Sequence, residues 1–351
     1  MKKVGILTFH YSNNNYGAVL QAYSIYKLIE DLGYQSYIID FIPKKERISK
    51  KDILQAIFGF RFRVFRKHYL KRLLDGKPQN LKKLNNTLDT FIVGSDQVWR
   101  YRPNTKALHT YFLDFVDHSR KIAYGASFGV DSWEGPPATV EEIRAKIIDF
   151  NAISVREQSG VDICKHTFGV KSELVIDPTL VINKKHFDDM TRDNQSNSKR
   201  KAYLGYMLLD ESEEHKQFFK NKARKYHLKF INIKGIPVNK KGLYIFNSPI
   251  KWLKLIKRAD VIVTDSFHCT VFSIIFQKKF ICLGNEKRGL TRLQNLLNLI
   301  GEPERLLLDL KNFDENLLTK GINYTKIKSV LDKEAENSIR YLKRSLTINK
   351  I

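Results

Sequence analysis

The strongest constraint on the fold of this chain is the stretch from Ala259 to Ile275, ADVIVTDSFHCTVFSII. β-Branched residues dominate Val261 to Thr264, which predicts a buried strand. Asp265 and Ser266 are residue types that cap helices, and the apolar run after them predicts a helix. A buried strand, a short loop and a helix in this order indicate a parallel sheet with crossover helices.

His268 lies in or just before the first turn of this predicted helix. Unpaired backbone N–H groups and the positive end of the helix dipole suit a phosphate or carboxylate at such a position. A histidine adds a hydrogen-bond donor that can also move protons near neutral pH. An ordinary crossover with a surface histidine has the same pattern, so this stretch alone leaves both interpretations open.

The amino-terminal part of the chain has the same design. Val4 to Phe9 predicts a strand, Gly17 to about Leu32 an amphipathic helix, and Tyr37 to Phe41 a second strand. The loop from His10 to Tyr16 contains three consecutive asparagines, which are common in simple turns. It also follows the carboxyl end of a strand, where open α/β sheets bind ligands, so both a turn and a ligand contact are consistent with it.

Four more short apolar strands are each followed by small or charged polar residues. The polar segments that follow them are Gly94 to Trp99, Ala126 to Gly129, Arg156 with Glu157, and Asp177 to Thr179. Each of these polar residues could merely cap a helix or pair with a neighbour. Together they predict a row of polar groups along one edge of one sheet, where a crevice lies.

The length of 351 residues exceeds what one ordinary core accommodates, so we expect two domains. We predict an α/β fold with two Rossmann-like domains and a cleft between them, the GT-B type. The first domain is expected at residues 1–182 and the second at 201–322, with a polar linker at 183–200 between them. The tail, 323–351, predicts a long basic helix that packs back on the first domain.

The formal net charge of +24 points to anionic partners. Nearly half of it comes from residues 44–83, a predicted helical insertion with fourteen Lys/Arg against three acidic residues and a net charge of +11. Apolar and aromatic residues recur there near helical spacing. This pattern fits a helix packed on the sheet with a solvated basic face, and it also fits contact with an anionic membrane. A nucleic-acid binder would leave the strand-end motifs unexplained, so we expect no nucleic acid partner.

The three cysteines are Cys164, Cys269 and Cys282, an odd and scattered set that shows neither a disulfide framework nor paired metal-ligand spacing. No metal site is therefore expected. The amino terminus predicts a first strand rather than a signal peptide, and no apolar run approaches the length of a spanning helix. We expect a cytoplasmic protein, with at most a peripheral contact at the inner face of the membrane.

Six motifs, in order, resemble the polysaccharide pyruvyl transferase family nearly from end to end of the chain. They are NNNYGAVLQAY (Asn13 to Tyr23), GSDQVW (Gly94 to Trp99), GASFG (Gly125 to Gly129), SVRE (Ser154 to Glu157), DPTL (Asp177 to Leu180) and TDSFHCTVFSI (Thr264 to Ile274). The family usually has glycine where this chain has Cys269. We therefore expect the side chain of Cys269 to narrow or reshape the ligand pocket.

The resemblance implies transfer of the enolpyruvyl group of phosphoenolpyruvate onto a sugar of a polysaccharide or of its lipid-linked precursor. The product is a cyclic pyruvate ketal, phosphate leaves, and no cofactor is needed beyond phosphoenolpyruvate as co-substrate. A GT-B glycosyltransferase that uses a nucleotide sugar is the alternative, and room for a nucleotide beside His268 would favour it.

The resemblance also implies roles for individual residues. His268, Asp96 and Arg156 are the expected catalytic residues, with His268 at the donor phosphate or as proton donor and Asp96 as base or as a ligand of the acceptor hydroxyl. The donor is expected to contact residues of both domains: Arg156, Ser266, His268, Lys287 and Arg292. The acceptor sugar is expected to contact Asn15, Gly17, Gln21, Ser127 and Asp177.

Overall fold

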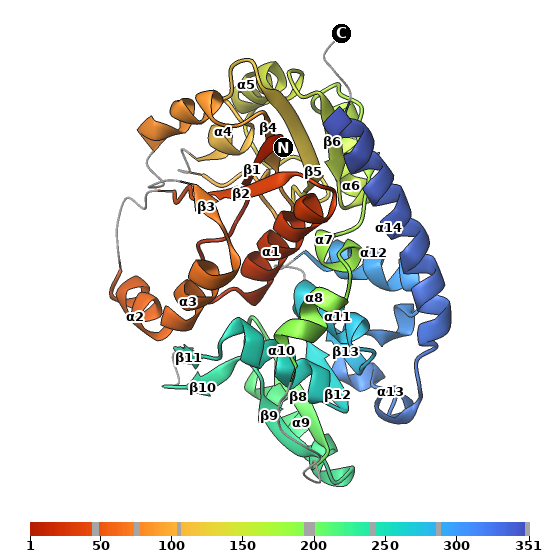
Figure 1. The fold of residues 1–351 in the computed structure, drawn as a ribbon. Coiled ribbons are helices and arrows are strands. Elements are labelled where there is room, and N and C mark those ends of the chain that lie inside the picture. The colour runs from red at the N-terminus through yellow and green to blue at the C-terminus, as the bar shows by residue number, and fades with distance from the viewer. Residues whose placement is uncertain are drawn as a thin grey trace.

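The structure is a computed structural model, and it describes residues 1–43, 49–73, 78–103, 107–192, 201–238, 243–285 and 289–347. Its described part contains two parallel sheets, a small antiparallel hairpin, and helices that cover the sheets (Figure 1). Among the described residues, no helix has the length and apolarity that crossing a membrane requires.

The first sheet has seven parallel strands in the order β3-β2-β1-β4-β5-β6-β7. Their bounds are β1 (Lys3–Leu7), β2 (Gln35–Ile39), β3 (Arg72–Leu73), β4 (Thr90–Val93), β5 (Arg120–Ala126), β6 (Ala152–Val155) and β7 (Glu173–Leu174). The strand order reverses between β1 and β4, so the crevice of an open α/β sheet is expected at the carboxyl ends of these two strands.

The second sheet has five parallel strands in the order β14-β13-β12-β8-β9. Their bounds are β8 (Tyr203–Met207), β9 (Lys229–Asn232), β12 (Val261–Thr264), β13 (Lys279–Leu283) and β14 (Leu306–Leu307). Its order reverses between β8 and β12, and the residues after β12 lead directly to His268. The antiparallel hairpin joins β10 (Gly235–Pro237) to β11 (Tyr244–Phe246).

Helices connect the strands and cover both faces of the sheets. The α-helices are α1 (Tyr16–Asp31), α2 (Lys50–Phe58), α3 (Phe60–Tyr69), α4 (Leu108–Tyr111), α5 (Pro137–Ile147), α6 (Gln158–His166), α7 (Pro178–Val181), α8 (Lys185–Met190), α9 (Glu213–Lys225), α10 (Pro249–Arg258), α11 (Phe267–Ile275), α12 (Leu290–Ile300), α13 (Asn316–Thr319) and α14 (Tyr324–Thr347). Short 3₁₀ turns are η1 (Pro78–Asn86), η3 (Pro303–Arg305) and η4 (Leu310–Asn312).

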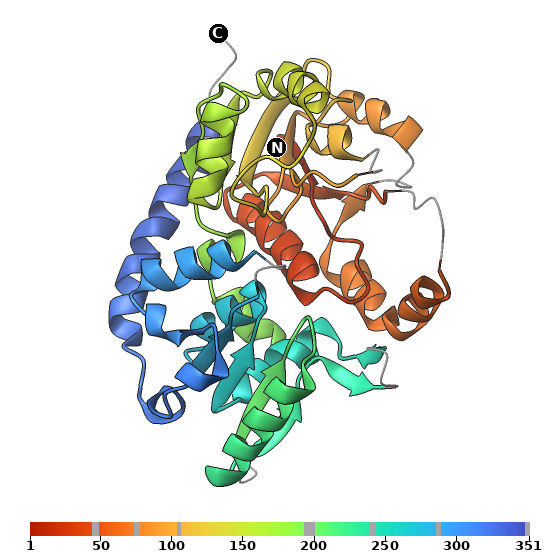
Figure 2. The same ribbon diagram turned by 180° about the vertical axis from the view of Figure 1, so that it is seen from behind.

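The helix α14 runs along both sheets (Figures 1 and 2). At its start, the hydroxyl of Tyr324 donates to the carbonyl of Lys278 in the second domain. Near its end, the buried Tyr341 hydroxyl donates to the carbonyl of Ala123 on β5 at 2.8 Å. The long tail helix therefore returns to the first sheet and ties the two halves of the molecule together.

Residues 183–200, predicted as a polar linker, contain the helix α8. Phe187 of this helix is fully buried, and its ring meets that of Phe272 on α11 edge-on at 5.0 Å. This part of the predicted linker is therefore an ordered helix, because one buried aromatic side chain outweighs the polar residues around it. Residues 193–200 of the predicted linker lie outside the described residues.

The predicted helical insertion, 44–83, is more varied than expected. It contains α2, α3 and part of η1, and it also supplies β3, which pairs with β2 at one edge of the first sheet. The pairing of a two-residue strand depends on a neighbour far along the chain, so helical spacing alone could not predict it.

Candidate active site

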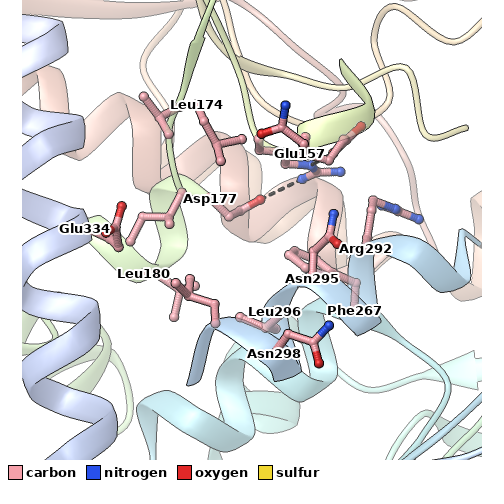
Figure 3. Close-up of a pocket in the computed structure, with 15 residues that line it drawn as sticks. Glu157, Leu174, Asp177, Leu180, Phe267, Arg292, Asn295, Leu296, Asn298 and Glu334 are labelled. Atoms are coloured by element: carbon pink, nitrogen blue, oxygen red, sulfur yellow. Dashed lines mark hydrogen bonds and ion pairs between the residues drawn. The ribbon is translucent and has the colours of Figure 1, made fainter. Parts of the chain in front are cut away.

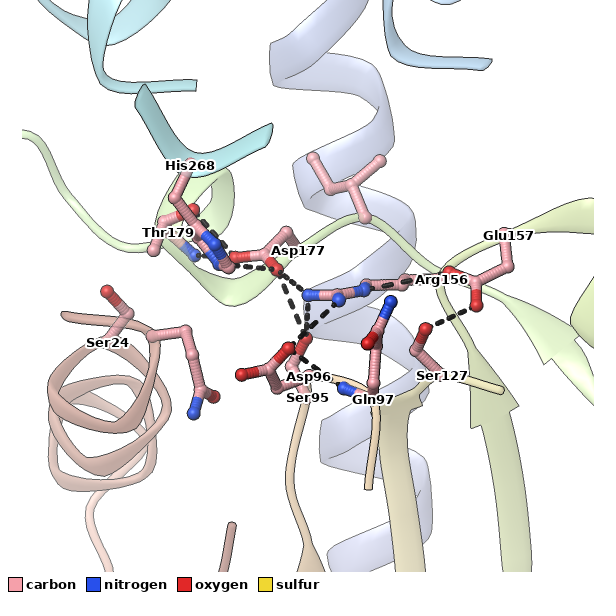
Figure 4. A network of polar contacts seen from close by, with 12 residues as sticks. Ser24, Ser95, Asp96, Gln97, Ser127, Arg156, Glu157, Asp177, Thr179 and His268 are labelled. Atoms are coloured by element: carbon pink, nitrogen blue, oxygen red, sulfur yellow. Dashed lines mark hydrogen bonds and ion pairs between the residues drawn. The ribbon is translucent and has the colours of Figure 1, made fainter. Parts of the chain in front are cut away.

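The polar residues after the strands of the first sheet meet the start of α11 from the second domain. Figure 4 shows Ser95, Asp96, Arg156 and Asp177 gathered below His268. The first four residues follow β4, β6 and β7, so they come together because parallel strands place their carboxyl ends at one edge of the first sheet, whereas His268 follows β12 of the second sheet. The row of polar groups predicted from the sequence therefore exists, and His268 faces it.

Arg156 is the centre of this polar network, with only 1% of its side chain exposed. Its Nη1 donates to Asp177 Oδ2 at 2.6 Å and to Ser95 Oγ at 3.1 Å. Its Nη2 donates to Asp96 Oδ1 at 3.4 Å. Burial alone would lower the pKa of Arg156, but the charges of Asp177, Asp96 and Glu157 raise it above the usual range. Arg156 therefore stays positively charged within the site.

Asp177 links this arginine to His268. Its Oδ2 lies 3.6 Å from His268 Nε2, and its Oδ1 accepts from the backbone N–H and the hydroxyl of Thr179, as the N-cap of α7. Burial alone would raise the pKa of Asp177, but the contacts with His268, Arg156 and Thr179 hold it well below the usual range. Asp177 is thus an anion that lies beside one nitrogen of the imidazole.

The other side of the His268 ring lies against Gly17 at the start of α1. A Cβ built on Gly17 would lie 2.2 Å from His268 Nδ1, so only glycine leaves room for the ring. Gly17 therefore makes space for the imidazole, because it has no side chain. His268 lies in the first turn of α11 and beside the first turn of α1, so two helix N-termini are directed at one imidazole.

Asp96 adopts a backbone conformation that is unusual for a residue with a side chain, with φ at 85°. Its carbonyl accepts from the N–H groups of Val98 at 2.7 Å and Ser127 at 3.1 Å, which hold the turn in place. Such strain costs about 1–3 kcal/mol and is common at functional sites. The turn directs the Asp96 carboxylate at Arg156, with 11% of the side chain still exposed.

Glu157 was not among the predicted site residues, although it belongs to the SVRE motif. One carboxylate oxygen accepts from the Ser127 hydroxyl and from the Gly129 N–H, and the other lies 3.6 Å from Arg156 Nε. Ser127, predicted to contact the acceptor, is fully buried and bonded to this carboxylate. Adjacency to Arg156 in the sequence was the one signal that could have identified Glu157.

A cavity of about 280 Å³ lies beside this network, between the two domains (Figure 3). Arg156, Glu157 and Asp177 line it from the first domain, and Phe267 and Arg292 line it from the second. Its other walls are largely apolar, with Glu334 of α14 at one side. His268 contacts the network but does not line this cavity.

Two guanidinium groups share one aromatic ring at this cavity. The Arg156 guanidinium lies 5.2 Å and the Arg292 guanidinium 5.7 Å from the centre of the Phe267 ring. Burial, together with the charge of Arg156, lowers the pKa of Arg292 to about 10. The sequence indicated both arginines separately, but the ring that brings them together was not predicted.

A second, more polar cavity of about 550 Å³ adjoins the first through Glu157 and Arg292, which line both. The start of α12 forms one wall and the loop after β5 the other. The Thr291 hydroxyl donates to Asp131 Oδ2 at 2.9 Å across this gap. This hydrogen bond joins the two domains beside the site.

The remaining predicted site residues have other positions. Ser266 is the N-cap of α11, and Asn15 is the exposed N-cap of α1. The Gln21 side-chain nitrogen donates to Thr8 Oγ1 and to the Phe9 carbonyl, while its oxygen is buried without a hydrogen bond. Lys287 lies outside the described residues.

Cys269 lines neither of the two cavities, so its side chain does not narrow either of them as expected. Its side chain is fully buried in the apolar core. Successive residues of a helix point about 100° apart, so the residue after His268 faces the sheet when His268 faces the other domain. Among the described residues, no group of three or more His, Cys, Asp or Glu could hold a metal ion.

Comparison with protein families decides which group of proteins the chain is part of. The family model described as polysaccharide pyruvyl transferase matches residues 15–287, more than three quarters of the chain. The chain belongs to the polysaccharide pyruvyl transferase family. The match includes Asp96, Arg156, Asp177 and His268, whereas α12 and α14 lie beyond it. No curated protein matches the chain in sequence.

Solved structures similar to this pyruvyl transferase family member show its fold. A UDP complex of S. aureus MnaA has a TM-score of 0.54 at 12% identity and covers 99% of this chain and 98% of its own. A UDP-GlcNAc 2-epimerase of Methanocaldococcus jannaschii has a TM-score of 0.50 at 15% identity, and the match spans 98% of this chain and 100% of the epimerase chain. A UDP-glucosyltransferase from Polygonum tinctorium has a TM-score of 0.50 at 9% identity, and the match spans 98% of this chain and 97% of the glucosyltransferase chain. The predicted GT-B fold is confirmed.

The close approach of Gly17 to His268 leads to a first prediction. Alanine normally stabilises a helix relative to glycine, but in Gly17→Ala the new methyl group meets the imidazole, which we expect to destabilise the protein by about 1–3 kcal/mol. Urea unfolding measures this change. Gly321→Ala is the matched control, because a Cβ on Gly321 meets nothing within 4 Å.

The double variant Gly17→Ala/His268→Ala should recover most of the stability lost in Gly17→Ala, because the clash is gone. If both single variants and the double variant gave strictly additive changes, the contact between Gly17 and His268 would not exist as described.

The charge of Asp177 leads to a second prediction. Since its pKa is lower in the folded than in the unfolded protein, its contribution to stability is complete well above pH 4 and declines as the pH falls through the folded value. Asp177→Asn should lower the free energy of unfolding by about 3–5 kcal/mol at pH 7, because it leaves Arg156 buried without its closest counter-charge. The difference from the wild type should shrink steadily below about pH 4.

Urea titrations at several pH values between 3 and 7 test this expectation. Asp332→Asn is the control, since this carboxylate is more than half exposed and its ion pair should contribute at most about 1 kcal/mol. A difference for Asp177→Asn that stays constant over the whole pH range would contradict a depressed pKa.

Proposed function

We propose that this family member transfers the enolpyruvyl group of phosphoenolpyruvate to a sugar of a polysaccharide or of its lipid-linked precursor. The observation that carries the proposal is the pair of arginines, one from each domain, at the cavity of about 280 Å³. Two like charges held close together in a buried position favour an anionic ligand between them. A donor with both a carboxylate and a phosphate meets this requirement.

The donor is proposed to bind with Arg156 and Arg292 at its anionic groups. Asp177, Asp96 and Glu157 raise the pKa of Arg156, whereas burial and the charge of Arg156 lower the pKa of Arg292 to about 10 although the same three carboxylates act on it. A bound anion would relieve the repulsion between the two guanidinium groups and favour the charged form of Arg292. We also propose that the donor contacts Ser266 at the start of α11 and Lys287.

His268 and Asp96 are proposed as the groups that move protons. Protonation of the donor's methylene carbon makes the adjacent carbon electrophilic, and a sugar hydroxyl attacks it while a base takes the hydroxyl proton. Loss of phosphate and attack by a second hydroxyl of the same sugar then close the cyclic ketal. His268 has the acid–base character that these steps need, and the exposed edge of the Asp96 carboxylate suits the base.

The acceptor is proposed to approach on the side of α1 and the second cavity. Asn15 is exposed at the start of α1, and the polar cavity of about 550 Å³ offers hydroxyl, amide and carboxylate groups to a sugar. Gly17 and Asp177 would shape this region through their positions beside His268, Gln21 from α1, and Ser127 through its hydrogen bond to Glu157. We also propose a lipid-linked acceptor and work at the inner face of an anionic membrane.

The small size of the two-arginine cavity favours this reaction over transfer from a nucleotide sugar. Pockets for drug-sized ligands measure about 300–1,000 Å³, and the two-arginine cavity falls just below that range. Among the described residues that line the larger cavity, none is aromatic, so none offers a ring on which a base could stack.

The direct test is incubation of the protein with phosphoenolpyruvate and a panel of lipid-linked and nitrophenyl sugars. We expect phosphate release that depends on the sugar, together with a mass gain on the sugar equal to one pyruvate ketal. Transfer of a sugar from a nucleotide sugar, with no phosphate released from phosphoenolpyruvate, would support the glycosyltransferase alternative instead.

The proposed role of His268 leads to a third prediction. His268→Ala should lower turnover by about 10²–10⁴-fold, the usual contribution of one acid–base group. His268→Asn should keep part of the donor binding through a hydrogen bond but lose proton transfer. His118→Ala, at an exposed histidine, is the matched control and should leave turnover unchanged. Turnover close to wild type in a stably folded His268→Ala protein would remove His268 from the mechanism.

A further inference from the structure

The helices α2 and α3 lie beside the β10–β11 hairpin (Figures 1 and 2), and exposed apolar and basic side chains are found on the surface of these elements. We propose that this surface, the docking face, binds an anionic lipid bilayer. Seven exposed apolar side chains define the docking face: Ile53, Leu54, Ile57, Phe60, Val64, Ile236 and Val238.

The apolar side chains of the docking face are concentrated to an unusual degree. Of the thirteen exposed large apolar side chains among the described residues, five lie within residues 53–64 and two more on or next to β10. Ile57 is 56%, Val64 60% and Ile236 65% exposed. Single exposed apolar residues are normal, but a contiguous group of them marks an interaction surface.

The docking face is held together by contacts between the two domains. The Arg61 Nη1 donates to the carbonyl of Phe246 on β11 at 2.9 Å. The Phe62 ring lies edge-on to the Phe246 ring at 6.2 Å and also packs against Tyr16 at 5.0 Å. The helices and the hairpin therefore present their exposed side chains as one surface.

The charge of this region decides between a bilayer and a second copy of the chain. Residues 49–73 contain eight Lys/Arg and one acidic residue, a net charge of +7. Lys50, Arg63, Lys67 and Lys71 have exposed side chains. A symmetric dimer through this face would bring two such positive surfaces together. Anionic lipid headgroups are complementary to these charges, and an amphipathic basic helix suits the lipid–water interface.

The docking face is also connected to the loop that leads to the candidate active site. Arg66 of α3 donates from Nη1 to the carbonyl of Ser12 and from Nη2 to Asn13 Oδ1, each at 2.8 Å. Gly59, between α2 and α3, lies so close that a Cβ on it would be 2.2 Å from the Asn13 carbonyl oxygen. A membrane bound here would lie next to the loop that caps α1.

This geometry suits a sugar acceptor that is carried by a lipid, because the membrane and the acceptor loop would lie on neighbouring elements. That step rests on the proposed function. The docking face itself does not, because it follows from exposure and charge alone, and its test needs no enzymatic reaction.

The experiment is sedimentation of the full-length protein with vesicles of phosphatidylcholine alone or of phosphatidylcholine with phosphatidylglycerol at 7:3. We expect most of the protein in the pellet with the mixed vesicles only, and its release at high salt, because screening weakens the electrostatic attraction. Equal recovery in the supernatant with both vesicle types would overturn the proposal.

Two pairs of variants separate the apolar from the electrostatic contribution. Ile57→Gln/Val64→Gln removes exposed apolar groups, and Arg63→Gln/Lys67→Gln should lower partitioning by about fivefold for each charge removed. The matched controls are Ile148→Gln/Leu308→Gln and Lys220→Gln/Arg224→Gln, at exposed positions elsewhere, and they should bind like the wild type. Melting temperatures verify that all variants are folded.

Two further results would overturn the docking face. One is equal loss of vesicle binding in a control pair and the matching test pair, which would indicate non-specific attraction by the whole cationic protein. The other is a dimer in analytical ultracentrifugation that Ile57→Gln/Val64→Gln dissociates, which would assign the face to a second copy. Vesicle binding without pyruvyl transfer would support the docking face while removing the proposed function.

Discussion

The buried contact between Arg156 and Asp177 is the interaction on which the rest of the candidate site depends. The arginine follows β6 and the aspartate caps α7, and the same Asp177 oxygen lies near His268 of the second domain. In a low-dielectric interior, removing one partner of such a pair typically costs about 3–5 kcal/mol. Asp96 and Glu157 also contact Arg156, and Asp177 lies 3.6 Å from His268 of the second domain, so this buried pair within the first domain connects the groups of the candidate site.

The fold could be predicted from the sequence wherever strands are apolar and followed by polar residues. The parallel α/β architecture is confirmed, and the predicted strand Val261–Thr264 has these bounds in the structure. Two of the misses share one cause, since α8 and β3 depend on partners far along the chain. A buried Phe187, or a strand of two residues, has no local pattern strong enough to stand out against its polar neighbours.

The candidate site could be predicted only in part, and for a similar reason. The motifs identified Asp96, Arg156, Asp177 and His268 one at a time, because each follows a predicted strand. Their mutual contacts depend on the order of strands in the sheet and on the packing of the domains, which no motif contains. Gly17 illustrates the difference: it was expected to face the acceptor, and the structure shows the His268 ring lying directly on its backbone. Phe267 was missed because an aromatic residue before a histidine more often belongs to the core.

The central claim is that Arg156 and Arg292, from opposite domains, hold the anionic groups of the donor at one cavity. Isothermal titration of phosphoenolpyruvate into the wild type and into Arg292→Gln tests this most directly, without a need for the acceptor. The account predicts one binding site in the wild type and about tenfold or greater loss of affinity in the variant, as expected when a charged hydrogen bond of about 1.5–3 kcal/mol is removed. Equal affinity of the two folded proteins for phosphoenolpyruvate would contradict it.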